Sequence, residues 1–198
     1  MVDQCPRAAY FARMAILPIL EVPDQRLKVI SNPVTEFNDE LKQLVEDMFD
    51  TMYDAPGIGL AAIQVGVPKR VLVIDLQEPA DHHHDHDGPC NHDHDVVRNP
   101  RIFINPEILD PSDEYSTYAE GCLSVPDQFA EVERPARIRA RWQDIDGKVH
   151  EEDMEGLMAT CLQHEMDHLE GILFIDHLSR LKRQMVLKKL EKQRKVAA

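Results

Sequence analysis

The chain has 198 residues, of which 43% are hydrophobic, so it is long enough for one globular domain with a sizeable core. No apolar stretch approaches the ~20 residues that a membrane span needs, and the N-terminus lacks the features of a secretory signal, so we expect a cytoplasmic protein. The net charge is −14, but residues 176–198 carry +6, which leaves −20 on the remainder. The four cysteines have no paired spacing, which favours packing, metal binding or catalysis over disulfides.

The N-terminal part of the sequence predicts an extension followed by an amphipathic helix. Residues 1–13 show no usable pattern, so we expect a disordered extension there and a single domain over 14–198. Asn38 is suited to be a helix N-cap, and Pro56-Gly57 would stop the helix. Between them, apolar residues recur at helical spacing, at Leu41, Leu44, Val45, Met48, Phe49 and Met52.

The middle of the chain reads as a series of strands. The β-branched run at residues 70–76 suits a buried strand, and residues 101–109 and 114–126 are strand-like segments with proline breaks. Residues 136–155 alternate around Asp146-Gly147, which is a strong hairpin signal. Short strands followed by helices indicate an α+β domain with antiparallel sheets.

Two helices are predicted in the C-terminal part. The first, within residues 155–171, ends at Gly171 and places four residues at helical spacing, namely Leu157, Cys161, His164 and His168. The second begins after Ser179, a suitable N-cap, and runs almost to the end of the chain. This second helix carries most of the positive charge of residues 176–198.

Residues 81–95 form a run of six histidines, five aspartates and one cysteine without helical or strand period. The run lies between two predicted strands and has no apolar residue of its own, so we expect a surface loop inserted outside the core, which costs little because closure entropy grows only logarithmically with length. Two interpretations remain open: a tolerated insert without function, or a loop that captures metal ions loosely.

The strongest chemical motif is His164-Glu165-Met166-Asp167-His168, an H-E-x-x-H sequence within the predicted helix. Residues four apart lie one turn above each other, so both imidazoles can reach one metal ion, and Glu165 can reach a water beside it. A third ligand is needed. Cys161 is favoured by its spacing on the same helix, whereas Cys122 lies between strand-like segments, and periodicity does not decide between them.

Three segments of the sequence, "GIGLAAIQ" (57–64), "EGCLS" (120–124) and "QHEMDHL" (163–169), resemble the signature motifs of the bacterial peptide deformylases, in the same order. The resemblance extends from about Met14 to the C-terminal helix and leaves out residues 1–13 and 81–95. It implies a one-domain α+β fold with strands packed around the H-E-x-x-H helix. It also implies one Fe²⁺ ion, replaceable by Zn²⁺, Ni²⁺ or Co²⁺, whose ligands are Cys122, His164 and His168.

The same resemblance implies the reaction and its catalytic residues. Peptide deformylases hydrolyse the N-formyl group of the initiator methionine of a nascent polypeptide and release formate. In that reaction Glu165 of the H-E-x-x-H motif can take a proton from the attacking water and give one to the leaving amine. The oxyanion is stabilised by the side-chain amide of Gln64 and the backbone N–H of Leu123.

Substrate binding and support of the metal are also assigned by resemblance. Ile58, Leu157 and Cys161 would line the pocket for the methionine side chain. Gly59 and Gly121 would let the peptide backbone approach and pair like an extra strand. Glu120 matches a position that pairs with an arginine, here Arg134, and so steadies the loop beneath the metal; a surface ion pair of little value is the alternative.

Two other functions fit parts of the sequence. An H-E-x-x-H metalloprotease would share the metal and the base, and His177 would be its third ligand. A metal-storage or metal-delivery protein would be built on residues 81–95, and would leave "GIGLAAIQ" and Glu165 without a task. The deformylase interpretation adds a partner: we expect the basic C-terminal helix to dock on the ribosome, and we expect no contact with membranes or DNA.

Overall fold

The computed structural model describes residues 15–79 and 96–197. The expected extension at 1–13 and the expected insertion at 81–95 lie outside the described residues. Within these ranges the chain forms three antiparallel sheets and three α-helices. No helix in the described ranges has the length and apolar composition that crossing a membrane requires.

The largest sheet has five antiparallel strands in the order β1-β2-β5-β8-β9. Its strands are β1 (Gly59–Ala61), β2 (Val71–Ile74), β5 (Arg101–Pro111), β8 (Arg137–Gln143) and β9 (Val149–Glu155). The second sheet is a hairpin of β6 (Tyr115–Cys122) and β7 (Val125–Pro135), and the smallest pairs β3 (Glu78–Pro79) with β4 (Val96–Val97). The helices are α1 (Asp39–Asp54), α2 (Gly156–Leu169) and α3 (Arg180–Ala197).

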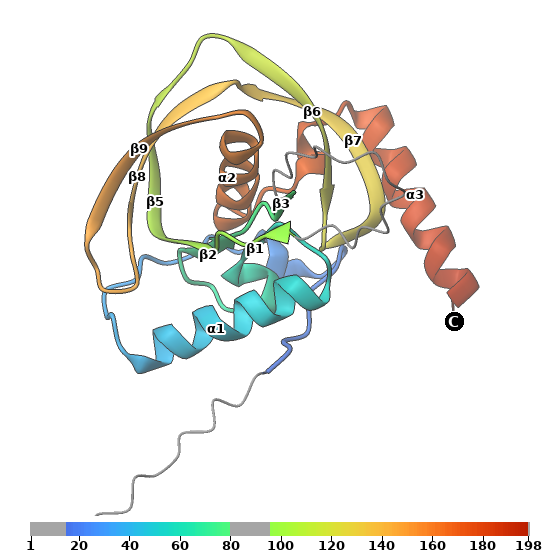
Figure 1. Ribbon diagram of the computed structural model, residues 1–198. Coiled ribbons are helices and arrows are strands. Elements are labelled where there is room, and N and C mark those ends of the chain that lie inside the picture. The colour runs from blue at the N-terminus through green and yellow to red at the C-terminus, as the bar shows by residue number, and fades with distance from the viewer. Residues whose placement is uncertain (1–14, 80–95, 198) are drawn as a thin grey trace, which may run out of the picture.

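Helix α2 lies at the centre of the molecule (Figure 1). It is enclosed by the strands of the large sheet on one side and by the β6–β7 hairpin on the other, while α1 covers β1 and β2 and α3 packs along β7. The buried residues of α2 include polar and ionisable side chains as well as apolar ones, among them His164, Glu165 and His168. These polar groups are therefore enclosed by the core instead of forming a solvent-exposed face. The predicted arrangement, antiparallel strands around a central helix with a further helix at the C-terminus, is confirmed.

The ends of the helices agree with their predicted caps. The Asn38 side chain accepts a hydrogen bond from the N–H of Leu41, and α1 ends at Asp54. Helix α2 ends in a Schellman arrangement, in which the N–H of Gly171 bonds to the carbonyl of His168. Gly171 has φ +70°, and a Cβ there would lie 2.6 Å from the Lys28 carbonyl oxygen, so only glycine fits.

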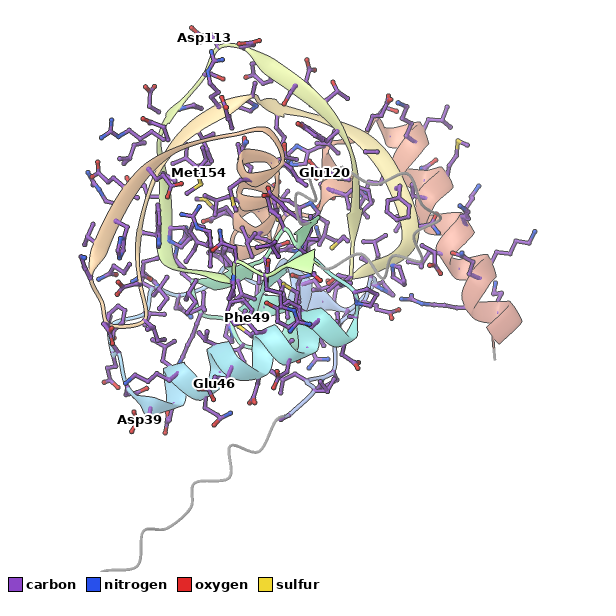
Figure 2. The ribbon with its side chains drawn as sticks, in the orientation of Figure 1. Asp39, Glu46, Phe49, Asp113, Glu120 and Met154 are labelled. Atoms are coloured by element: carbon purple, nitrogen blue, oxygen red, sulfur yellow. The ribbon has the colours of Figure 1, made fainter. Side chains whose placement is uncertain are left out.

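Helix α1 is amphipathic, as its spacing predicts. Leu41, Val45, Met48 and Met52 are buried against β1 and β2. Figure 2 shows Asp39 and Glu46 on the outer side of this helix, and the side chain of Phe49 turned toward the sheet. The helix therefore closes one face of the large sheet and leads directly into the segment that precedes β1.

Two strand predictions need correction. The expected proline break in residues 101–109 does not occur, because β5 continues through Pro106 with a bulge between Ile104 and Glu107. Asn105 has φ +50° in this bulge, and its side chain bonds to both backbone polar groups of Val34. Residues 127–135 belong to β7, which the sequence did not predict; the segment 114–126 is β6, a tight turn and the start of β7.

Candidate active site

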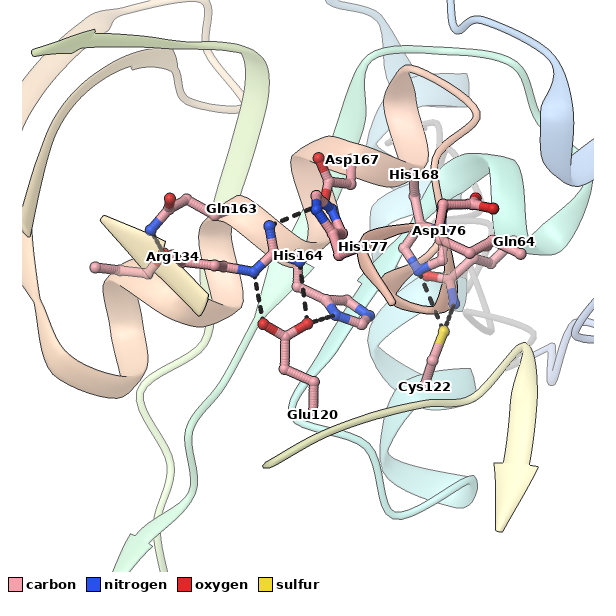
Figure 3. A network of polar contacts seen from close by, with 12 residues as sticks. Gln64, Glu120, Cys122, Arg134, Gln163, His164, Asp167, His168, Asp176 and His177 are labelled. Atoms are coloured by element: carbon pink, nitrogen blue, oxygen red, sulfur yellow. Dashed lines mark hydrogen bonds and ion pairs between the residues drawn. The ribbon is translucent and has the colours of Figure 1, made fainter. Parts of the chain in front are cut away.

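Three side chains from two distant parts of the chain meet beside α2. The sulfur of Cys122, at the end of β6, lies within 4.8 Å of imidazole nitrogens of His164 and His168 on α2. The distance from Cys122 Sγ to His168 Nε2 is 3.2 Å. In the described ranges these are the residues whose ligand atoms converge closely enough to hold one ion, and Figure 3 shows them facing the same space. A thiolate with two imidazoles is a donor set suited to iron or zinc.

The turn between β6 and β7 aims Cys122 at the helix. The pairing of the two strands shifts after Gly121, so that Cys122 lies opposite Val125 with only two residues between them. Ser124 anchors this turn, because its hydroxyl accepts a hydrogen bond of 3.1 Å from Gln64 Nε2 and its carbonyl accepts one from the N–H of Val22. The sulfur position is therefore a product of sheet register.

A buried ion pair fixes the orientation of His164. Glu120 Oε2 lies 2.7 Å from His164 Nδ1, which leaves Nε2 as the nitrogen available to the cluster. Arg134 binds both oxygens of Glu120 at 2.5 and 3.0 Å and reaches Asp167 Oδ2 at 2.8 Å. Both partners are about 95% buried, so the alternative of a surface ion pair is wrong. The predicted contact between Glu120 and Arg134 is present (Figure 3).

Electrostatics in this network favour charged Glu120 and neutral His168. Burial acts to raise the pKa of Glu120, but hydrogen bonds from His164 and Arg134 and the charge of Arg134 lower it to about 2. Burial and the nearby charge of His164 lower the pKa of His168 well below its usual value. A neutral imidazole keeps the lone pair that a metal ligand requires. The Nδ1 atom of His168 is buried without a hydrogen-bond partner among the described residues.

Glu165 is a buried carboxylate beside the cluster and has no ion-pair partner among the described residues. Its Oε2 atom makes no hydrogen bond within the described part of the chain. Burial, partly opposed by the charge of His164, raises the pKa of Glu165 to about 7. A Cβ on Gly59 would lie 2.5 Å from Glu165 Oε1, so glycine at this position leaves room for the carboxylate. Glu165 is thus poised to exchange a proton near neutral pH.

A cleft of about 660 Å³ opens over the cluster. Its walls come from the segment before β1, from β1 and η2 (Ala62–Val65), from both strands of the β6–β7 hairpin and from α2. Of the predicted site residues, eight line it: Ile58, Gly59, Gln64, Gly121, Cys122, Leu123, His164 and Glu165. The sequence did not predict the contribution of β7, where Phe129 lines the cleft and is 73% exposed. The sequence-based prediction missed it because it did not identify residues 127–135 as a strand that pairs with the strand containing "EGCLS".

The other predicted site residues lie outside this lining. Cys161 is buried behind Gly59, where a Cβ on the glycine would be 3.0 Å from its sulfur, and burial raises the pKa of its thiol well above the usual value. Leu157, in the first turn of α2, is 43% exposed. His177, the third ligand that a metalloprotease would use, contacts Asp167 Oδ2 at 2.7 Å and is not part of the cluster.

Comparisons with known proteins agree on one family. The profile of the polypeptide deformylase family matches residues 16–184. A peptide deformylase of Novosphingobium aromaticivorans is 75% identical over 190 residues, covering 93% of this chain and 100% of the relative. The crystal structure of a peptide deformylase from Legionella pneumophila superposes with a TM-score of 0.79 and 42% identity, over 92% of this chain and 98% of that one. The crystal structure of the peptide deformylase from Ehrlichia chaffeensis in complex with actinonin superposes with a TM-score of 0.78 and 39% identity, over 91% of this chain and 98% of that one.

Proposed function

The chain belongs to the polypeptide deformylase family, and we propose that Cys122, His164 and His168 hold one divalent metal ion at its reaction centre. The protein is a hydrolase that removes the N-formyl group from nascent polypeptides. The observation that carries the proposal is the convergence of one sulfur and two imidazoles within 4.8 Å beside a buried carboxylate. An ion held there supplies the Lewis acidity that lets water attack an amide at neutral pH.

The proposed ion is Fe²⁺, with Zn²⁺, Ni²⁺ or Co²⁺ able to replace it. The support for this choice is the mixed donor set, because a soft thiolate and two imidazoles suit these metals better than Mg²⁺ or Ca²⁺. The Glu120 contact to His164 Nδ1 supports the same role, since such partners orient a ligating imidazole and raise its basicity.

Glu165 is the proposed general base and acid. Its pKa near 7 lets the carboxylate take a proton from the attacking water and return one to the leaving amine of the peptide. The carboxylate has no arginine or lysine partner among the described residues, so its charge is not already neutralised. This arrangement differs from that of Glu120, whose charge is held permanently by Arg134.

Gln64 and Leu123 are the proposed oxyanion donors. The Oε1 atom of Gln64 accepts a hydrogen bond of 2.8 Å from the N–H of Ala61, and its NH₂ group contacts Cys122 Sγ at 3.6 Å and Ser124 Oγ at 3.1 Å. Gln64 also lines the cleft above the cluster, which supports a role for its amide there. Leu123 lies in the tight turn that follows Cys122 and lines the same cleft, which supports the proposal that its backbone N–H is the second donor.

The substrate is proposed to bind as an added strand between β1 and β6. Among the described strands each of these has one unpaired edge, because β1 is the outermost strand of the large sheet and β6 pairs with β7 alone. Gly59 and Gly121 lie on these edges and line the cleft. Ile58, Leu157 and Cys161 are proposed to form the methionine pocket. The position of Cys161 directly behind Gly59 supports this placement.

The decisive experiment compares two cysteine variants in metal content and activity. We expect Cys122→Ser to lose the tightly bound ion and formate release from a formyl-methionyl peptide, because two imidazoles alone leave an incomplete set of ligands. Cys161→Ser should keep the ion and change mainly the Michaelis constant. If Cys161→Ser lost the ion and Cys122→Ser kept it, the assignment would be reversed. Cleavage of internal peptide bonds by the wild-type protein would favour the metalloprotease instead.

The basic helix α3 is proposed to dock on the ribosome, which presents formylated chains in the cytoplasm. Leu190 packs into the core with Val125 and Phe174, so one side of α3 is fixed and its exposed lysines face outward. Because truncation would remove Leu190, reversal of charge at Lys188 and Lys189 is the better test. Ribosome affinity and its salt dependence should fall while activity on short peptides persists; unchanged affinity would disprove the contact.

The domain boundaries remain part of the proposal. We assign the catalytic domain to residues 14–198, with 1–13 as an extension and 81–95 as an insertion without a catalytic role. The β3–β4 pair, which joins residues 78–79 to 96–97, supports this assignment because it brings the two ends of the proposed insertion together. Deletion of 81–95 should leave formate release within about twofold.

A further inference from the structure

Asp75 is a buried carboxylate that the proposed mechanism does not use. It follows β2 and is 0% exposed. Its Oδ2 atom accepts a hydrogen bond of 2.6 Å from the Tyr53 hydroxyl, and its Oδ1 atom accepts bonds of 3.1 Å from the backbone N–H groups of Gln77 and Asn99. A fully buried carboxylate with this many partners joins three segments: the end of α1, the end of β2 and the residues after β4.

These bonds lead directly to the wall of the substrate cleft. The backbone N–H of Asp75 donates to the carbonyl of Ile58 at 2.9 Å. The side chain of Gln77, whose backbone has φ +51° in the turn that Asp75 holds, donates to the carbonyl of Gly57, also at 2.9 Å. Two successive carbonyls of the cleft wall are thus held by Asp75 and by a residue that Asp75 positions.

Tyr53 adds a third connection to the same segment. It lies in the last turn of α1, immediately before the residues that enter the cleft wall. Burial, together with its bond to Asp75, raises the pKa of Tyr53 to about 12, so the hydroxyl stays protonated and remains a donor. The guanidinium of Arg98 lies 4.3 Å from the centre of the Tyr53 ring and covers it.

We propose that Asp75 is a positioning residue, which acts through Gln77 to hold the segment before β1 in the conformation that receives substrate. This inference rests on the proposed role of Ile58 and Gly59 in substrate binding. The segment has little regular structure of its own, and Pro56 within it has φ +20°. Without these bonds the segment would have to be ordered by the substrate, and that cost weakens binding more than it slows the chemical step.

The test measures kcat, KM and bound metal in variants of this network. Gln77→Met keeps the length of the side chain and removes its donor. We expect KM for a formyl-methionyl peptide to rise about fivefold, as for one lost hydrogen bond, with kcat within about twofold. Asp75→Ala should raise KM further. Asp75→Asn should restore it, because the amide oxygen can accept both backbone bonds and the amide nitrogen can donate to Tyr53.

Asp144 provides a control outside the cleft with a similar set of hydrogen bonds, although its side chain is 32% exposed. Its carboxylate also receives two backbone N–H bonds and contacts one side chain, His150, in the turn between β8 and β9. Asp144→Ala should leave KM and kcat unchanged within about twofold. A rise in KM for Asp75→Ala but not for Asp144→Ala would show that the effect comes from the support of the cleft and not from the loss of any carboxylate in a turn.

The outcomes separate this inference from the function on which it rests. If Ile58→Ala leaves KM unchanged, the proposed substrate contact fails. If Ile58→Ala raises KM while Gln77→Met does not, the contact stands and the positioning role of Asp75 is wrong. A fall in kcat that follows loss of bound metal would also overturn the positioning role. Should Asp75→Ala fail to fold, the result for Gln77→Met decides alone.

Discussion

Charged groups lie around both α2 and α3, but in opposite environments. Around α2 the charges are buried and linked, as in the pair of Arg134 and Glu120, whose side chains are 6% and 5% exposed. Along α3 the charges are exposed to water, as in the pair of Lys195 and Glu191, whose side chains are 73% and 66% exposed. A buried ion pair with its hydrogen bonds satisfied fixes the geometry around it, whereas an exposed pair is screened and fixes little.

The comparison also distinguishes two carboxylates near α2. Glu120 receives hydrogen bonds from Arg134 and contacts His164, and its pKa is held at about 2. Glu165 is buried without such a partner in residues 15–79 and 96–197, and its pKa rises to about 7. The two carboxylates therefore differ as their proposed roles require: Glu120 keeps a permanent charge beside His164, and Glu165 can exchange a proton near neutral pH.

The largest expected effect is on Glu165, the unpaired buried carboxylate. Glu165→Gln should lower kcat by roughly 10²–10⁴-fold, because the amide cannot accept the proton of the attacking water. Metal content should remain unchanged, and the free energy of unfolding should not fall, because a buried carboxylate without an ion-pair partner is removed. On one sample, kcat is measured by steady-state kinetics, metal content by metal analysis, and the free energy of unfolding by urea titration. A loss of activity below tenfold would argue against the role.

The second effect concerns the paired charge. Arg134→Leu should lower the free energy of unfolding by roughly 3–5 kcal/mol, because it leaves Glu120 buried without its cation. Metal affinity should fall by about 10–100-fold as His164 loses its fixed orientation. Urea unfolding and a competition assay with a metal chelator measure these changes. If the free energy of unfolding fell by less than about 1 kcal/mol, this buried pair would contribute no more than a surface pair such as those of α3, and the prediction would be wrong.

The third effect is the pH dependence of the Glu120 contribution. The folded-state pKa of about 2 lies below the ordinary value of 4.5, so the stabilisation is present above pH 4.5 and is lost as the pH falls toward 2. The difference in unfolding free energy between the wild type and Glu120→Gln should therefore shrink over this range by about 3 kcal/mol at most. Unfolding curves at several pH values test this. A difference that stays constant down to pH 2 would contradict the lowered pKa.

The smallest effect is expected on α3. Arg194 pairs with Glu21 at the surface, with side chains 39% and 45% exposed. Arg194→Ala should change the free energy of unfolding by less than about 1 kcal/mol, and added salt should reduce even that difference. The matched control is Arg134→Leu, which should keep most of its effect at high salt. Equal salt sensitivity of the two variants would remove the distinction between the helices.

Much of the helical structure was predictable because helix signals are local. Asn38 caps the start of α1 and Gly171 follows the end of α2, as the sequence predicts. The apolar spacing of α1 matches its buried face. The H-E-x-x-H spacing likewise required His164 and His168 to share one side of a helix. These features depend on contacts within a few residues, so they can be recognised without knowledge of the rest of the fold.

The sequence by itself determined the helix that carries the two imidazoles and the carboxylate, and its resemblance to a family named the third ligand. Only the tertiary structure decided that Cys122 meets that helix while Cys161 lies behind Gly59, that Glu120 and Arg134 are buried, and that β7 completes the cleft. It also revealed the bonds of Asp75 to the cleft wall. The physical reason is that these contacts join residues far apart in the chain through strand register and burial, neither of which local periodicity contains.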